Sequence, residues 1–147
     1  MEILNQLHVH LLHPKVIHFP IALFIGALGM EVLSLMIKKD NLHRTALHMY
    51  IFATAITPFV VLTGLQEADH LHLHHPVLTI HRNFALLTMW GSLVSLPILG
   101  PASKIGEKVL KIVFIVFLIM LATFVSVTGY NGGRMVYEYG VGTEQEQ

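Results

Sequence analysis

Residues 16–37 read VIHFPIALFIGALGMEVLSLMI, an apolar run in which Glu31 is the one formal charge. Three further charge-poor runs follow at about 45–65, 77–99 and 110–130. A helix rises 1.5 Å per residue, so each run is long enough to cross the roughly 30 Å hydrocarbon core of a bilayer. Since these runs fill most of the chain, the sequence predicts a single all-α domain, an integral membrane four-helix bundle with up-down-up-down topology.

The composition of the 147-residue chain supports this setting and excludes other classes of protein. Hydrophobic residues make up 54% of the chain and charged residues 12%, against about 25% charged residues in soluble domains. Nine basic and nine acidic residues balance, which excludes a nucleic-acid partner because such proteins present a basic surface. The absence of cysteine from the sequence excludes disulfides, cysteine-ligated clusters and covalently attached haem.

The placement of lysine and arginine predicts the orientation. Six of these residues flank the first and third connections between the runs, namely Lys38, Lys39, Arg44, Lys104, Lys108 and Lys111. Three lie on the other side, namely Lys15, Arg82 and Arg134. By the positive-inside rule we expect a multi-pass protein of the cytoplasmic (inner) membrane, with both termini and the histidine-rich side on the periplasmic or extracellular face. Residues 131–147 are too polar to span and are expected to form an outer C-terminal cap.

Eleven histidines in a mostly apolar chain require an explanation. In the expected orientation nine of them lie at or beyond the outer membrane boundary, namely His8, His10, His13, His18, His70, His72, His74, His75 and His81. Clustered neutral imidazoles serve two chemistries, the coordination of transition metals and the axial ligation of haem iron.

Two of the histidines are placed to share a haem. His18 and His81 fall at equivalent depth near the outer ends of the first and third helices, which run parallel and face each other across a four-helix bundle. A b-type haem held by two histidines requires imidazoles in such positions. His13 is the substitute for His18. The alternative is that these histidines bond to backbone carbonyls at the interface, such as a carbonyl that Pro20 frees.

Small and polar side chains predict the inner face of the third helix. His81, Ala85, Thr88, Ser92 and Ser95 recur every three or four residues and therefore share one face. We expect this face to point into the bundle because lipid offers hydroxyl groups no partner.

The fourth helix carries a second set of small residues, at Ala122, Ser126, Gly129 and Gly133. Such a groove serves either tight helix packing or the accommodation of a flat macrocycle. Arg134 follows directly, and its guanidinium suits the carboxylates of haem propionates. Gly129, Gly133 and Arg134 are therefore candidate cofactor contacts.

The outer loop supports a second interpretation. His70, His72, His74 and His75 alternate so that three imidazoles share one side of an extended segment. Together with His13, His18 and His81 they form a candidate set of ligands for Zn, Cu or Ni. The alternative is a solvated polar loop between two helices.

Glu31 lies deep in the first run, where a charge is costly unless it is protonated or paired. It is a candidate proton or quinone contact, or else a protonated carboxyl group hydrogen-bonded across the bundle. His43 and His48 lie near the cytoplasmic end, and neither has a histidine partner on another helix. We therefore predict no second buried haem held by two histidines.

Four motifs resemble an uncharacterised family of predicted four-helix membrane proteins of bacteria and archaea. They are HPxx(V/I)HFPI at 13–21, TGL at 63–65, a histidine at 81 and GGxxVYxxGVG at 132–142. Members of this family occur fused to Rieske iron–sulfur or cytochrome c domains, so the resemblance implies a redox role on the outer face. The chain departs from the family in having Glu31 where Asp is frequent and Tyr139 where His is frequent.

These observations predict a membrane-embedded b-type cytochrome, or a haem-bearing subunit of a redox complex, that transfers electrons near the outer face. We expect an electron-transfer protein rather than a stand-alone enzyme, with haem b as cofactor. Besides the lipid bilayer, the expected partners are a Rieske-type or cytochrome c protein, a larger membrane complex, and quinone. The alternatives are an outer-face protein that binds Zn, Cu or Ni, and a non-catalytic assembly subunit.

Overall fold

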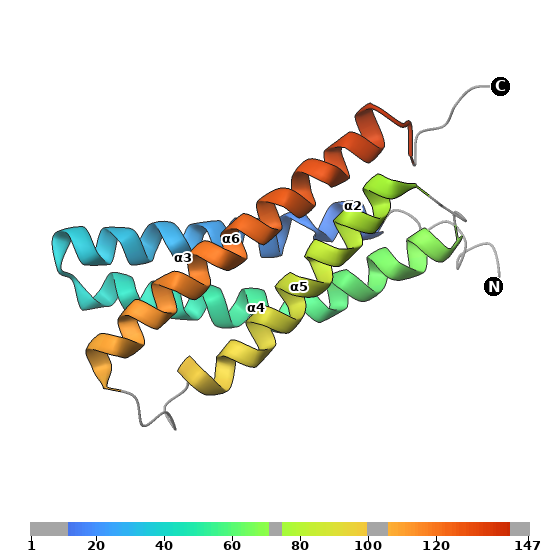
Figure 1. The fold of residues 1–147 in the computed structure, drawn as a ribbon. Helices are drawn as coiled ribbons and strands as arrows, with labels where there is room; N and C mark the ends of the chain where they lie inside the picture. Colours follow the sequence, from blue (N-terminus) through green and yellow to red (C-terminus); the bar gives the residue numbers. More distant parts are fainter. Residues whose placement is uncertain (1–11, 71–74, 100–105, 142–147) are drawn as a thin grey trace.

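The computed structural model describes residues 12–70, 75–99 and 106–141, which form helices joined by short turns (Figure 1). The elements are α2 (Leu12–Val16), α3 (His18–Ile37), α4 (Asp40–His70), α5 (Pro76–Leu99) and α6 (Glu107–Tyr137). The described part of the chain is therefore all-helical, as the sequence predicts, with four long helices and a short one ahead of them.

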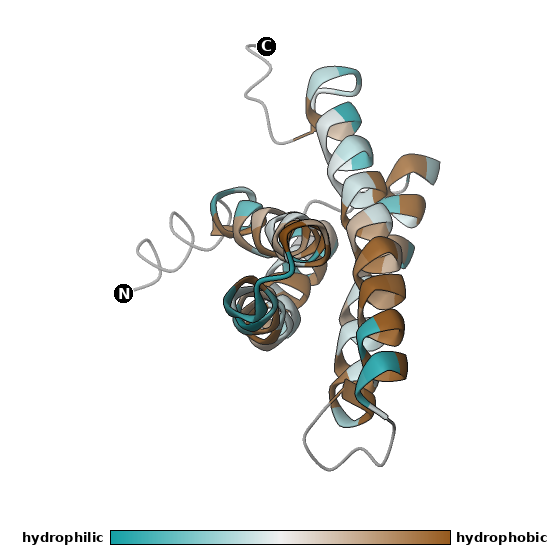
Figure 2. Ribbon diagram, turned by 90° about the vertical axis from the view of Figure 1, so that its left-hand side faces the viewer, coloured by the Kyte–Doolittle hydropathy of each residue, from teal (hydrophilic) through white to brown (hydrophobic). Residues whose placement is uncertain are grey.

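The four long helices form two hairpins. Helix α3 lies beside α4, and α5 lies beside α6 (Figure 1). The hairpins cross, so that α3 and α4 are seen nearly end-on in the view in which α5 and α6 run up the picture (Figure 2). They contact each other through α3 with α6 and through α4 with α5.

The break between α2 and α3 follows from a proline. Pro20 has no N–H group, and its ring clashes with the carbonyl four residues earlier, that of Val16. Helix α2 accordingly ends at Val16, and α3 begins after Ile17. Helix α3 thus covers nearly all of the run expected over 16–37, and the short helix α2 precedes it.

A tight turn joins α3 to α4. Lys38 adopts the left-handed conformation, with φ 54° and ψ 46°, which ends α3 and reverses the chain. The hydroxyl of Ser34 donates a hydrogen bond to the carbonyl of Lys39 at 3.1 Å. Because the turn is so short, the two helices remain in contact.

An aromatic cluster fills the core between the hairpins. The Tyr50 ring lies 5.6 Å from that of Phe114 and 6.4 Å from that of Phe24, centroid to centroid. The Tyr50 hydroxyl donates to the carbonyl of Ser92 at 2.9 Å and lies 2.6 Å from the Ser95 hydroxyl. These polar contacts connect α4 to α5 inside the core.

The inner face of α5 is confirmed. His81, Thr88, Ser92 and Ser95 are buried, and Ala85 is half-buried. The three hydroxyl groups also bond to backbone carbonyls within α5, so each has a partner inside the protein.

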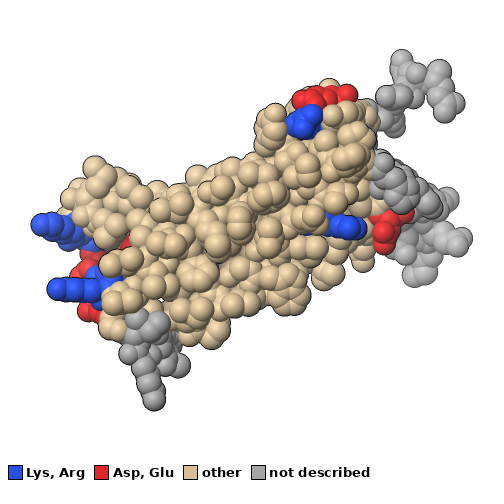
Figure 3. All heavy atoms as spheres, viewed as in Figure 1, with Lys and Arg blue, Asp and Glu red and all other residues tan. Residues whose placement is uncertain are grey.

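The outer surface of the bundle is apolar along the helices. Charged side chains gather towards its ends, and the surface between them shows few charges (Figure 3). Among the described residues, three segments are long and apolar enough to cross a membrane, Leu12–Ile37, Asp40–Asp69 and Glu107–Tyr137. Helix α5 has 24 residues but is not among them. The chain therefore has transmembrane helices.

Two helices run further than expected. Helix α4 continues past Gly64 to His70, because Gly64 keeps a helical backbone instead of forming a left-handed cap. Helix α6 continues through 131–137, a segment that we expected to fold back as part of the cap. Asn131 donates its side-chain N–H to the Val127 carbonyl at 2.8 Å, and the chain turns only at Gly140, where φ is 66°.

Replacing Tyr50 with Phe should destabilise the bundle by about 0.5–1.5 kcal/mol, because the hydroxyl links α4 to α5. Denaturant titration of the protein in detergent measures the change in the free energy of unfolding. Tyr137→Phe is the matched control, since the Tyr137 side chain is 90% exposed. Equal stability of the two variants would contradict a structural role for the Tyr50 hydroxyl.

Candidate functional site

His13 lies on α2 and is held against α4. Its Nδ1 lies 3.1 Å from the Val60 carbonyl and 3.3 Å from the Thr63 hydroxyl. The Thr63 hydroxyl itself donates to the Val60 carbonyl at 2.7 Å, so its proton is already engaged. The His13 Nδ1–H group therefore donates to the carbonyl, which fixes the imidazole on the α3–α4 hairpin.

His81 is held in the same way on the other hairpin. Its side chain is buried on α5, and its Nδ1 lies 2.9 Å from the Thr128 carbonyl of α6. The only acceptor in this contact is a carbonyl oxygen, so Nδ1 carries the proton. Each imidazole thus bonds to the backbone of the neighbouring helix.

The two histidines meet between the hairpins. The centroids of the His13 and His81 rings lie 6.2 Å apart, and the ring planes are nearly perpendicular, at 83°. Within the part of the chain that the structure describes, Nε2 of either ring has no hydrogen bond. A histidine that binds a metal usually donates Nδ1–H to a carbonyl or carboxylate and offers the Nε2 lone pair. Both histidines therefore have the tautomer that metal-binding histidines usually have.

A glycine leaves room for each ring. A Cβ atom at Gly64 would lie 2.6 Å from the His13 ring, closer than real side chains approach. A Cβ atom at Gly132 would lie 3.3 Å from the His81 ring. Gly64 on α4 and Gly132 on α6 thus accommodate the two imidazoles.

His13 is the histidine that lies beside His81, whereas we expected His18 in that position. The side chain of His18 is exposed at the start of α3. His13 and His18 lie on different helices, α2 and α3, on either side of the break at Ile17. The substitute in our sequence prediction is therefore the histidine that meets His81.

The other expected cofactor contacts on α6 lie elsewhere. A Cβ atom at Gly129 would contact Ile21 at 3.5 Å, and one at Gly133 would meet nothing within 4 Å. Arg134 is paired within its own helix, with Nε 2.8 Å from a Glu138 carboxylate oxygen. Its Nη2 also donates to the Tyr139 hydroxyl at 3.1 Å. The α6 glycine beside His81 is Gly132, which the spacing of small residues did not single out.

The loop tract does not join this pair in the described residues. His72 and His74 lie outside the described residues, and His70 is the last residue of α4. His75 accepts a hydrogen bond from the Val77 N–H at 3.2 Å, and its ring lies 4.2 Å from that of Tyr139. Over 12–70, 75–99 and 106–141, no group of three or more His, Asp or Glu side chains is arranged to hold a metal ion.

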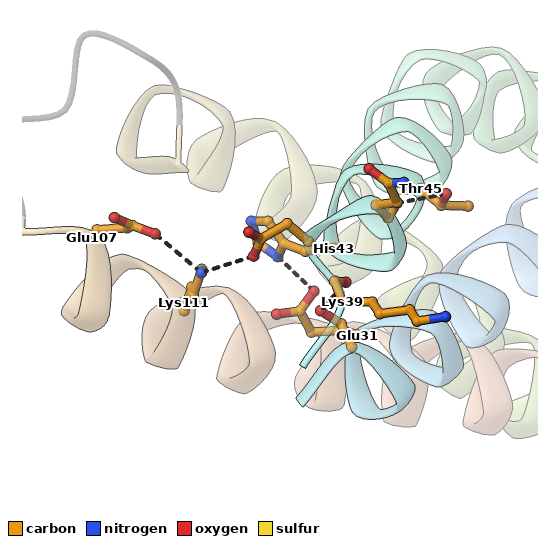
Figure 4. A network of polar contacts seen from close by, with 9 residues as sticks. Glu31, Lys39, His43, Thr45, Glu107 and Lys111 are labelled. Atoms are coloured by element: carbon orange, nitrogen blue, oxygen red, sulfur yellow. Dashed lines mark hydrogen bonds and ion pairs between the residues drawn. The ribbon is translucent and has the colours of Figure 1, made fainter. Parts of the chain in front are cut away.

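A second polar contact lies at the other end of the bundle, where α3 turns into α4 (Figure 4). Glu31 is 1% exposed, and one of its carboxyl oxygens lies 2.7 Å from Nδ1 of His43. The contact joins the neighbouring helices α3 and α4 of one hairpin. From the sequence we expected only that His43 lacks a histidine partner, and its pairing with Glu31 was not expected. Their spacing of twelve residues across a turn was the available signal.

Comparison with protein families gives one match. The sequence profile of a family described as "Predicted membrane protein (DUF2231)" matches residues 9–145. Comparison with curated proteins and with solved structures gave no match.

Replacing Gly64 with Ala should destabilise the protein, because the new methyl group displaces His13 from its carbonyl. Gly29→Ala is the control, since a Cβ atom there meets nothing within 4 Å and alanine favours a helix by about 0.5–1 kcal/mol over glycine. Chemical unfolding in detergent compares the two. If Gly64→Ala stabilises the chain as much as Gly29→Ala does, the described packing of His13 is wrong.

Proposed function

The chain belongs to this family of predicted membrane proteins, and we propose that it is a membrane-embedded b-type cytochrome in which His13 and His81 hold haem b. One observation carries the proposal: two imidazoles from different hairpins lie 6.2 Å apart, each with Nδ1 bonded to a carbonyl. Haem iron takes four nitrogens from the porphyrin and needs two further ligands, which is the number that this site supplies.

The dimensions of the pair fit ligation of one iron. A metal–nitrogen bond of about 2 Å places the centroids of two opposed imidazoles about 6 Å apart. The rings of His13 and His81 are 6.2 Å apart. Because one ligand comes from each hairpin, a haem bound by both would lie between the hairpins. The absence of cysteine from the sequence means that it would be held non-covalently.

The chain's own residues would orient the ligands and shield them from water. The Val60 and Thr128 carbonyls hold the imidazoles by Nδ1, which makes Nε2 a better electron donor. Burial of His81 and the apolar helices around it keep the local dielectric low. When bound, haem b supplies a one-electron Fe(III)/Fe(II) couple, and the protein then transfers electrons at this end of the bundle.

We further propose that the histidine pair lies on the outer side of a cytoplasmic membrane. In this orientation the chain crosses up-down-up-down, with both termini on the periplasmic or extracellular face. The distribution of basic residues supports this orientation. The opposite end of the bundle, where α3 turns into α4, carries Lys38, Lys39 and Arg44. Lys111 joins them, since its Nζ lies 3.7 Å from Asp40 at the start of α4. A Rieske-type or cytochrome c protein would then reach the haem from the outside.

A second candidate is a site for a Zn, Cu or Ni ion. Two imidazoles that bind one metal ion have ring centroids about 6 Å apart, and the rings of His13 and His81 are 6.2 Å apart. The same separation therefore suits an ion that is bound without a porphyrin. Such an ion would take its remaining ligands from water, from the loop histidines or from a partner.

The visible spectrum of the purified protein tests the haem. We expect a Soret band and, after reduction with dithionite, sharp α and β bands typical of iron with two histidine ligands. His13→Ala and His81→Ala should each abolish the low-spin spectrum, because each removes one axial ligand. His18→Ala and His48→Ala should retain it, since both side chains are exposed.

Reconstitution with haem b guards against incomplete loading during expression. A protein that stays colourless after reconstitution would refute the haem proposal. Metal analysis of the same sample then separates the two alternatives. A metal-binding protein should contain Zn, Cu or Ni and lose it in His13→Ala and His81→Ala. A non-catalytic assembly subunit should contain none of these metals.

A further inference from the structure

The contact between Glu31 and His43 is distant from the histidine pair. Along α4, His43 precedes Val60 by 17 residues, which is about 25 Å at 1.5 Å per residue. Glu31 lies inside the protein, with one carboxyl oxygen on His43. Its other oxygen, Oε1, is buried without a hydrogen-bond partner in the described residues. A carboxyl group is costly in such a place, so the contact calls for a functional reason.

His43 connects this buried carboxyl group to a cavity of about 250 Å³ that opens beside it between α4, α5 and α6. The apolar wall of the cavity comes from Leu47, Leu99, Leu110 and Phe114. The Phe114 ring meets the His43 ring edge-on, with centroids 5.7 Å apart and planes at 89°. The imidazole is thus held by Glu31 at Nδ1 and by Phe114 at its side.

The rim of the cavity is polar and charged. Figure 4 shows two of its residues, Glu107 and Lys111, pointing toward each other. Lys111 lies 3.1 Å from Glu107 and 3.7 Å from Asp40, so its charge is balanced by two carboxylates. Arg44 also lines the cavity. A mostly apolar wall with a few polar and charged groups is the usual lining of a site for a small organic molecule.

We propose that this cavity binds the ring of a lipid-soluble quinone or quinol, with His43 as its hydrogen-bonding group and Glu31 as the positioning residue. Among the described residues, Nε2 of His43 has no hydrogen bond, so it is available to a ligand. A neutral imidazole accepts a hydrogen bond from a quinol hydroxyl, and a protonated imidazole donates one to a quinone carbonyl. Glu31 holds the imidazole at Nδ1, and the apolar wall of the cavity would pack against the ring.

The size of the cavity and its place in the membrane agree with this ligand. Sites for drug-sized molecules occupy about 300–1,000 Å³, so a cavity of about 250 Å³ suits a single substituted ring rather than a larger molecule. The tail of a quinone would remain in the bilayer around the helices.

Equilibrium binding of radiolabelled decylubiquinone to the full chain in detergent tests the proposal. Competition with unlabelled decylubiquinone corrects for partition into micelles. We expect saturable binding, at least tenfold weaker in His43→Ala and several-fold weaker in Glu31→Gln. His48→Ala is the matched control on the same helix, and its affinity should equal that of the unmodified protein.

A variant that fills the cavity covers the case in which His43→Ala does not fold. Leu110→Trp leaves Glu31 and His43 intact and should abolish binding by occupying the space of the ring. Absence of saturable binding by the unmodified protein would overturn the proposal, as would equal affinity in a folded His43→Ala or Leu110→Trp. His81→Ala, which removes a proposed haem ligand, should bind decylubiquinone normally, so this test is separate from that of the haem.

Discussion

The structure depends on one constraint: in an apolar surrounding, each polar group needs a partner inside the protein. The hydroxyl groups of α5 meet this need by bonding to backbone carbonyls on the buried face. His13 and His81 meet it with carbonyls of α4 and α6, which places both rings between the hairpins. Glu31 meets it at one carboxyl oxygen, with His43, whereas its other oxygen has no hydrogen-bond partner in the described residues. The same requirement thus determines which faces turn inward and where the two candidate sites form.

Much of this arrangement could be predicted from periodicity and charge. The four long helices and the inward face of α5 follow from apolar runs and three- and four-residue spacing. The choice of His13 over His18 could not be predicted, because it depends on the break at Ile17 and on the rotation of a five-residue helix. The place of Gly64 could not be predicted either: a glycine near the end of an apolar run is typical of a helix cap, whereas here it makes room for an imidazole from another helix.

The two proposed sites divide the bundle by chemistry. One end offers two neutral imidazoles that belong to different hairpins, and so depends on the tertiary contact between hairpins. The other offers a carboxyl–imidazole pair within the α3–α4 hairpin, next to a cavity closed by α5 and α6. About 25 Å of helix separates them, so we treat electron transfer at the first and ring binding at the second as independent functions.

The meeting of His13 with His81 is the central claim, and cysteine cross-linking tests it most directly. Since the chain has no cysteine, two can be introduced without competing thiols. His13→Cys combined with His81→Cys should cross-link rapidly with a short bifunctional thiol reagent, as detected by mass spectrometry of the joined peptides. His18→Cys combined with His81→Cys should stay near background. Preferential cross-linking of the second pair would contradict the account.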